Sequence, residues 1–234
     1  MRLALALSVA LAAASPLPGV VHADDGVGTR RLFTPGHELG VVGGTTGLLI
    51  GAGAPRPSLV GVTYEENAGV VGEFLVYGLA RLLGLTESSH PRERRTFTTH
   101  VAVRGYLPVG EGFAGGGEFS FGGNARLFEV QEFGPMALSF AVRIGFLAEG
   151  SRQAAMDALT LRLHAPVFAE VSMFMQFDAN LYALLDSEKI RQWWRPSPVT
   201  LGFQWDVSRM LWLRAEGSFV FRDVAGQLSG GLRL

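Results

Sequence analysis

Residues 169–181, AEVSMFMQFDANL, change side-chain character at almost every step. The odd positions, which include Val171, Met173 and Phe177, are apolar, whereas most even positions are polar, among them Gln176 and Asp178. Successive side chains of a strand point to opposite faces, whereas those of a helix repeat about every 3.6 residues. The stretch therefore predicts a β-strand with one apolar and one polar face.

The same alternation recurs along most of the chain. It is regular in residues 97–107, 136–146, 199–207 and 211–222. We predict an all-β fold, a closed antiparallel up-and-down transmembrane barrel of about twelve strands, with ten or eight as alternatives. The predicted strands are 38–52, 58–66, 70–84, 95–108, 112–122, 124–132, 136–148, 157–165, 168–182, 198–206, 209–222 and 226–234.

Composition supports a barrel and excludes several other classes. The chain is 48% hydrophobic and 18% charged, and it contains 31 glycines, which weaken helix interiors but are tolerated at turns and crowded strand positions. A net charge of −1 gives no basic field for nucleic acid. The absence of cysteine excludes a disulfide framework, a thiolate metal site and a cysteine nucleophile.

The first 23 residues have the three parts of a secretory signal peptide. Arg2 provides the positive charge, residues 3–14 form a short apolar stretch, and residues 21–23 (VHA) match the small-x-small cleavage rule. We therefore predict a signal peptide at 1–23, a periplasmic N-terminal lead-in at 24–37 and the barrel at 38–234. No later apolar run reaches the roughly 18 uncharged residues that a membrane helix needs.

The lengths of the connections predict an orientation. In a membrane barrel both termini face the periplasm, where turns are short, and the longer loops lie outside. With the first strand running outward, the connections on the termini side are 67–69, 109–111, 132–135, 165–167 and 206–208. The three longest connections, 85–94, 149–156 and 183–197, then lie on the opposite side.

In these features the chain resembles the β-barrel proteins of the Gram-negative outer membrane, over essentially all of 38–234. The resemblance implies export to the cell outer membrane, contact with its lipid and lipopolysaccharide, and insertion by the barrel-assembly machinery. Our working hypothesis is a passive role, either as a narrow, porin-like pore for small solutes or as a structural barrel whose loops contact the surroundings. The oligomeric state stays open.

The polar strand faces carry charged side chains that we expect to face the lumen. Across hairpins we predict the pairs Arg104–Glu118, Arg162–Glu170 and Glu216–Arg233, because unpaired charge in a confined space is costly. Structural ion pairs are the first interpretation, and a charge-selective constriction is the alternative. The candidates are Arg81, His100, Arg104, Glu118, Arg143, Arg162, Glu170, Asp178, Arg214, Glu216 and Arg233.

The loop 183–197 contains Trp193, Trp194 and Arg195, which we interpret as membrane-interface residues or as contacts for an external partner. Aromatic rings with a polar edge favour the membrane–water interface, and a neighbouring cation can touch lipopolysaccharide phosphates. The girdle at a strand end is the first interpretation, and a recognition loop is the alternative.

Two other functions remain as alternatives. The first is an outer-membrane hydrolase acting on lipid or peptide, for which the best candidate pair is His100 with Ser120 across its hairpin. We nevertheless assign no catalytic residue, no cofactor and no metal site, because the histidines are scattered without ligand spacing. The second is a secreted soluble β-barrel binding protein, which would appear in the culture medium.

Overall fold

A computed structural model describes residues 27–45, 57–67, 97–180, 199–220 and 223–234 of the chain. Within these residues no helix is long and apolar enough to cross a membrane. The elements are η1 (Gly28–Phe33), β1 (Gly36–Thr45), β2 (Ser58–Asn67), β3 (Phe97–Tyr106), β4 (Gly115–Val130), η2 (Gln131–Phe133), β5 (Gly134–Glu149), β6 (Arg152–Ala155), β7 (Ala158–Pro166), β8 (Val171–Asn180), β9 (Val199–Asp206), β10 (Leu211–Val220) and β11 (Asp223–Arg233).

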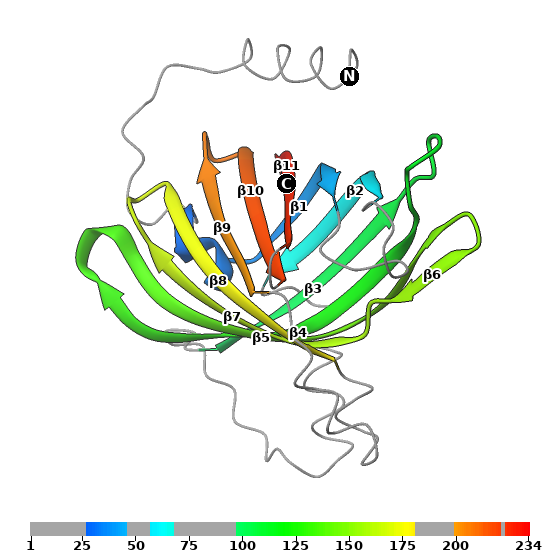
Figure 1. The fold of residues 1–234 in the computed structure, drawn as a ribbon. Helices are drawn as coiled ribbons and strands as arrows, with labels where there is room; N and C mark the ends of the chain where they lie inside the picture. Colours follow the sequence, from blue (N-terminus) through cyan, green and yellow to red (C-terminus); the bar gives the residue numbers. More distant parts are fainter. Residues whose placement is uncertain (1–26, 46–56, 68–96, 181–198, 221–222) are drawn as a thin grey trace, which may run out of the picture.

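The strands form one closed antiparallel barrel (Figure 1). Each barrel strand pairs with the next along the chain, and β1 pairs with β11 from Glu38↔Arg233 to Gly44↔Gln227, which closes the ring. The barrel has ten strands. β6 lies outside that count, because it pairs only with the last residues of β5, 146–149, while β7 pairs with residues 137–143 of the same strand.

The difference between ten strands and the first estimate of twelve has two sources. The predicted strand 70–84 lies outside the described residues, and β2 already pairs with β1 on one edge and β3 on the other. The predicted strands 112–122 and 124–132 are one continuous strand, β4. Gly122 and Gly123 lie within β4, and a Cβ on Gly122 would overlap the carbonyl oxygen of Phe140.

The merged strand also changes the orientation argument. Gly36, Asn67, the η2 turn and Arg233 lie at one end of the barrel, the terminal end. The connection 109–111, predicted there, lies at the opposite end, where Ser58 donates a hydrogen bond to the carbonyl oxygen of Gly112 (2.7 Å). The turn after Glu149 is also at the opposite end, whereas the connections 132–135, 165–167 and 206–208 are at the terminal end. Predicted connections 85–94 and 183–197 lie outside the described residues.

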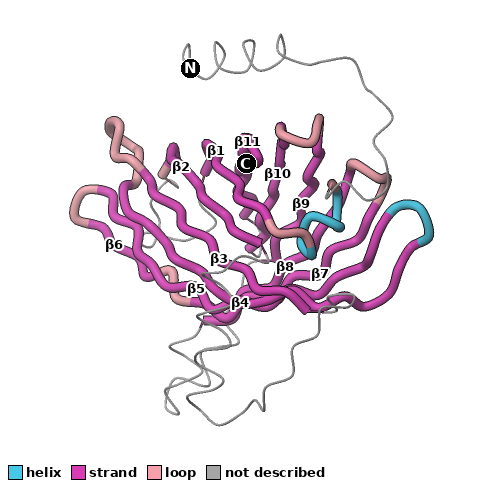
Figure 2. Tube along the Cα trace, turned by 180° about the vertical axis from the view of Figure 1, so that it is seen from behind, coloured by secondary structure: helices cyan, strands magenta, loops and turns pink. Residues whose placement is uncertain are grey.

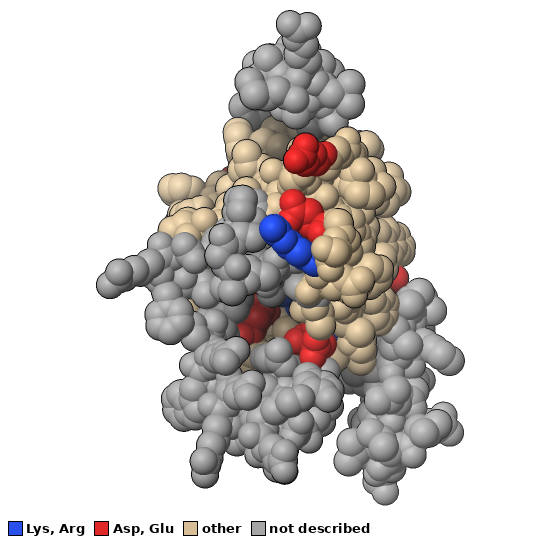
Figure 3. All heavy atoms as spheres, turned by 45° about the vertical axis from the view of Figure 1, so that its right-hand side comes forward, with Lys and Arg blue, Asp and Glu red and all other residues tan. Residues whose placement is uncertain are grey.

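The barrel is apolar outside and polar inside. Phe177 is 40% exposed and Phe203 55%, whereas the alternating neighbours Gln204 and Asp206 are 0% and 1% exposed. Figure 3 shows a side of the molecule on which the described surface is largely uncharged, and most of the charged side chains in view lie in one strip. A soluble barrel has the reverse arrangement, because its apolar faces point inward, away from water, and its polar faces point outward.

The two ends of the lumen are filled differently. At the terminal end η1 lies inside the ring of strands, where Thr98 Oγ1 donates a hydrogen bond to the carbonyl oxygen of Leu32 (2.6 Å). Figure 2 shows both short helices at this end and β6 at the other. Toward the opposite end lies an apolar cluster of buried side chains: Val42, Leu59, Tyr106, Ala114, Leu147 and Met156.

Candidate functional site

A network of ion pairs between arginines and carboxylates crosses the lumen, and its centre is Arg214 on β10. Arg214 Nη1 and Nη2 donate to the two carboxylate oxygens of Glu65 on β2, at 2.7 and 3.0 Å. Two strands, β11 and β1, separate these residues around the wall, so the pair spans the interior. Arg214 Nε also donates to Gln204 Oε1 (3.0 Å). This paired geometry is the strongest that an arginine makes with a carboxylate.

From Glu65 the network of ion pairs continues through side chains of β3, β4 and β5. Arg104 lies opposite Glu118 in the register and forms salt bridges with Glu118 (3.3 Å) and Glu65 (3.5 Å). Arg143 on β5 binds Glu118 at 2.7 Å and Asp178 on β8 at 3.2 Å. Each of these carboxylates therefore meets at least one arginine.

In the other direction the network of ion pairs reaches η1 and the seam, which is the pairing of β1 with β11 that closes the barrel. Arg233 Nη2 lies 2.9 Å from Glu38 Oε1 and 3.0 Å from Asp206 Oδ1. Arg31 of η1 also contacts Glu38, at 3.4 Å. Burial lowers the pKa of Arg31 below its usual value, and the Glu38 carboxylate opposes that shift. Asp206 further accepts a hydrogen bond from the backbone N–H of Gly28, so the seam holds η1 in place.

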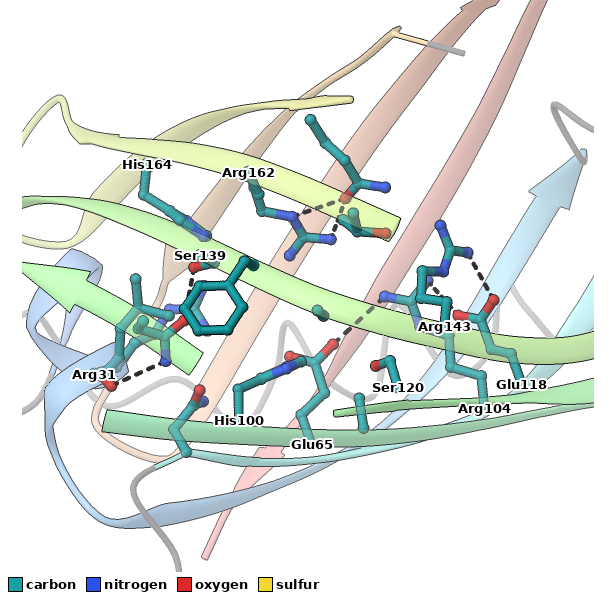
Figure 4. A pocket seen from close by; sticks show the side chains of 18 residues that line it. Arg31, Glu65, His100, Arg104, Glu118, Ser120, Ser139, Arg143, Arg162 and His164 are labelled. Carbon is teal, nitrogen blue, oxygen red and sulfur yellow. Dashed lines mark hydrogen bonds and ion pairs between the residues drawn. The ribbon is translucent and has the colours of Figure 1, made fainter. Parts of the chain in front are cut away.

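A cavity lies beside this network of ion pairs, between η1 and the walls formed by β3, β5 and β7 (Figure 4). Its empty volume is about 610 Å³, including the solvent open to it. Four arginines and two glutamates line it, so its charged lining is positive in excess. The charged and imidazole side chains of the lining are Arg31, Glu65, His100, Arg104, Glu118, Arg143, Arg162 and His164.

The hydrolase candidate pair is not hydrogen-bonded in the described structure. His100 and Ser120 both line the cavity, but Ser120 lies opposite Ala102 in the register, and His100 lies opposite Gly122. None of the described hydrogen bonds joins the two side chains. A nucleophilic serine needs its base within hydrogen-bond reach, so the described geometry gives no activated nucleophile here.

Two predicted ion pairs are wrong. Arg162 lies opposite Gln176, because the β7–β8 turn takes up Glu170 before β8 begins at Val171. Glu216 lies opposite Gln227 and contacts Arg214 at 3.8 Å, which leaves Arg233 to Glu38 and Asp206. Arg81, Trp193, Trp194 and Arg195 lie outside the described residues.

Several residues of the network were missed by the sequence reasoning. Asp206 stands on the polar face of a regularly alternating strand, whereas residues 58–66 carry glutamates on both faces, Glu65 and Glu66, so alternation did not single out Glu65. Glu38 and Arg31 gave no such signal, because they stand at or before the start of the first strand. Their roles depend on η1 and on the seam, which only the closed barrel creates.

Neither the models of known protein families nor the curated proteins give a match to this chain.

Proposed function

We propose that this protein is a β-barrel of a Gram-negative outer membrane whose lumen is closed by its own side chains, and whose role is structural or surface contact instead of solute passage. One observation carries the membrane assignment: the apolar faces of the strands point outward along the wall, and the charged faces point inward. Water disfavours that arrangement, whereas a bilayer favours it.

The filling of the lumen supports the closed state. Arg214 and Glu65 reach each other from strands on different sides of the interior, and η1 occupies the terminal end. Both are held by direct contacts between buried groups. An open pore would need these groups to part, at the cost of leaving charges without partners.

Export and lipid contact complete the proposal. The signal-like segment at 1–23 supplies the route, and outward side chains such as Phe203 and Leu201 meet the lipid. Lipopolysaccharide and the barrel-assembly machinery are the partners expected for such a barrel.

Cell fractionation and electrophoresis test the membrane assignment. Expressed with its own leader in a Gram-negative host, the protein should appear in the outer-membrane fraction, begin at Asp24, and migrate faster in unboiled than in boiled samples. Recovery as a soluble periplasmic or secreted protein would contradict the assignment.

Planar-bilayer recording tests the closed lumen. The purified, folded protein should give no stable single-channel steps at neutral pH. Reproducible steps of uniform size would overturn the closed state and support the narrow-pore alternative. A control with heat-unfolded protein distinguishes such steps from non-specific leakage.

A further inference from the structure

Arg162 differs from the other arginines that line the cavity. Arg31, Arg104 and Arg143 each form a salt bridge with a carboxylate. Arg162 instead donates from both Nε (2.8 Å) and Nη2 (2.5 Å) to one amide oxygen, Oε1 of Gln176. No described salt bridge includes Arg162, and no described hydrogen bond uses its Nη1.

The neighbouring histidine has an open ring nitrogen. His164 stands two residues after Arg162 on β7, so both side chains point to the lumen face, as Figure 4 shows. His164 is only 2% exposed, and its Nδ1 has no hydrogen-bond partner in the described structure. A buried polar atom without a partner is costly, and a ligand that forms a hydrogen bond with it removes that cost.

Phe174 on β8 fixes the two side chains. The Arg162 guanidinium lies 4.6 Å from the centre of the Phe174 ring, and the His164 ring lies 5.9 Å from it. A Cβ on Gly202 would overlap the Phe174 ring, so the glycine makes room for it. The cationic fork is therefore held rigidly while part of it remains without a protein partner.

We propose that the cavity binds a small oxyanion, a carboxylate or a phosphate, at Arg162 and His164. An arginine fork matches the paired oxygens of such groups, and a ring nitrogen adds a further hydrogen bond. The positive excess of the lining favours an anion over a cation, and Arg162 is the arginine whose charge no carboxylate neutralises by contact. This site adds ligand binding to the proposed structural role. It requires only that the cavity is open to solvent, and it does not require a passage through the barrel.

Calorimetric titration of the folded protein in a non-ionic detergent tests the proposal. Acetate and inorganic phosphate, titrated at constant ionic strength, should give saturable binding with at least one of them. Arg162→Gln should weaken that binding about tenfold or more, because a charge-assisted hydrogen bond is lost. The matched control is Arg152→Gln, a half-exposed arginine paired with Glu149 outside the cavity, which should bind as the wild type does.

The outcomes separate the sources of the anion. Binding of phosphate or acetate assigns a free anion, whereas binding of hexyl phosphate without inorganic phosphate assigns a lipid-like headgroup. Absence of binding by all three probes, or an Arg162→Gln protein that binds as tightly as the wild type, would overturn the proposal. If Arg162→Gln does not fold, His164→Phe replaces it, and unchanged anion binding by that variant would also overturn the proposal.

Discussion

Two regions of the same lumen hold their arginines in different ways. At the seam cluster, formed by Glu38, Glu65, Asp206, Arg214 and Arg233, each arginine contacts more than one carboxylate. At the cavity wall, formed by β7 and β8, Arg162 contacts an amide and a ring. The comparison teaches that burial alone does not tell a structural arginine from a binding one; the chemistry of its partners does.

The seam cluster should carry the largest stability effect. Arg214→Met leaves Glu65 buried beside a single, longer contact from Arg104, and we expect a loss of about 3–5 kcal/mol in the free energy of unfolding. Urea unfolding in lipid vesicles, followed by tryptophan fluorescence, measures it. The double variant Arg214→Met/Glu65→Leu should recover most of the loss, and a single variant within about 1 kcal/mol of the wild type would contradict the structural role.

The outward face of the barrel wall should give the second-largest effect on the free energy of unfolding. Phe203→Arg places a charge on the outward face of β9, and in a bilayer we expect a cost of about 2–4 kcal/mol. The matched control is Phe168→Arg, equally exposed but in the turn at the terminal end, where the cost falls to about 0–1 kcal/mol. Equal, small effects of both substitutions on vesicle unfolding would argue for a water-facing wall.

The seam also anchors η1, and this anchor should be weaker than the ion pairs. Gly28 has φ 58°, and a Cβ there would overlap the carbonyl oxygen of Ala169. We expect Gly28→Ala to destabilise the docking of η1 by about 1–3 kcal/mol, seen as faster hydrogen exchange in residues 28–33. The control Gly112→Ala has a similar φ of 77° but open space around it, so η1 exchange should stay unchanged.

The cavity wall should give the smallest stability effect. Arg162→Met removes hydrogen bonds to one amide oxygen and breaks no described salt bridge, so we expect a loss of about 1 kcal/mol. The same urea unfolding experiment compares it directly with Arg214→Met. A loss as large as that of Arg214→Met would erase the distinction between the two regions.

The faces of the strands could be predicted from the sequence, because period-2 alternation is a local property. On β8 and β9 it placed Gln176 and Asp206 inside and Phe177 and Phe203 outside, and the structure confirms this for the described residues. The pairing of Arg104 with Glu118 also follows from one hairpin. The same reasoning gave the wrong partner for Arg162. Alternation shows which face a side chain occupies but not how many residues the turn before β8 takes up, and so it does not fix the register.

The rest of the network depends on closure. Arg214 meets Glu65 across two intervening strands, so the contact needs the strand tilt and curvature of a closed ring. Of the predicted counts, about twelve with ten or eight as alternatives, the structure supports ten, because residues 115–130 form one strand, β4. His164 was not among the predicted site residues, although its two-residue spacing from Arg162 already put both on one face.

The pairing of β1 with β11 has a consequence for how the barrel folds. Glu38 and Arg233, joined across the seam, are separated by 195 positions in the chain. Bringing such distant residues together carries a large loop-closure entropy, and folds rich in these contacts form slowly. The first strand therefore keeps one unpaired edge until the last strand has been synthesised, and the ion pairs across the seam cannot form before these two strands meet.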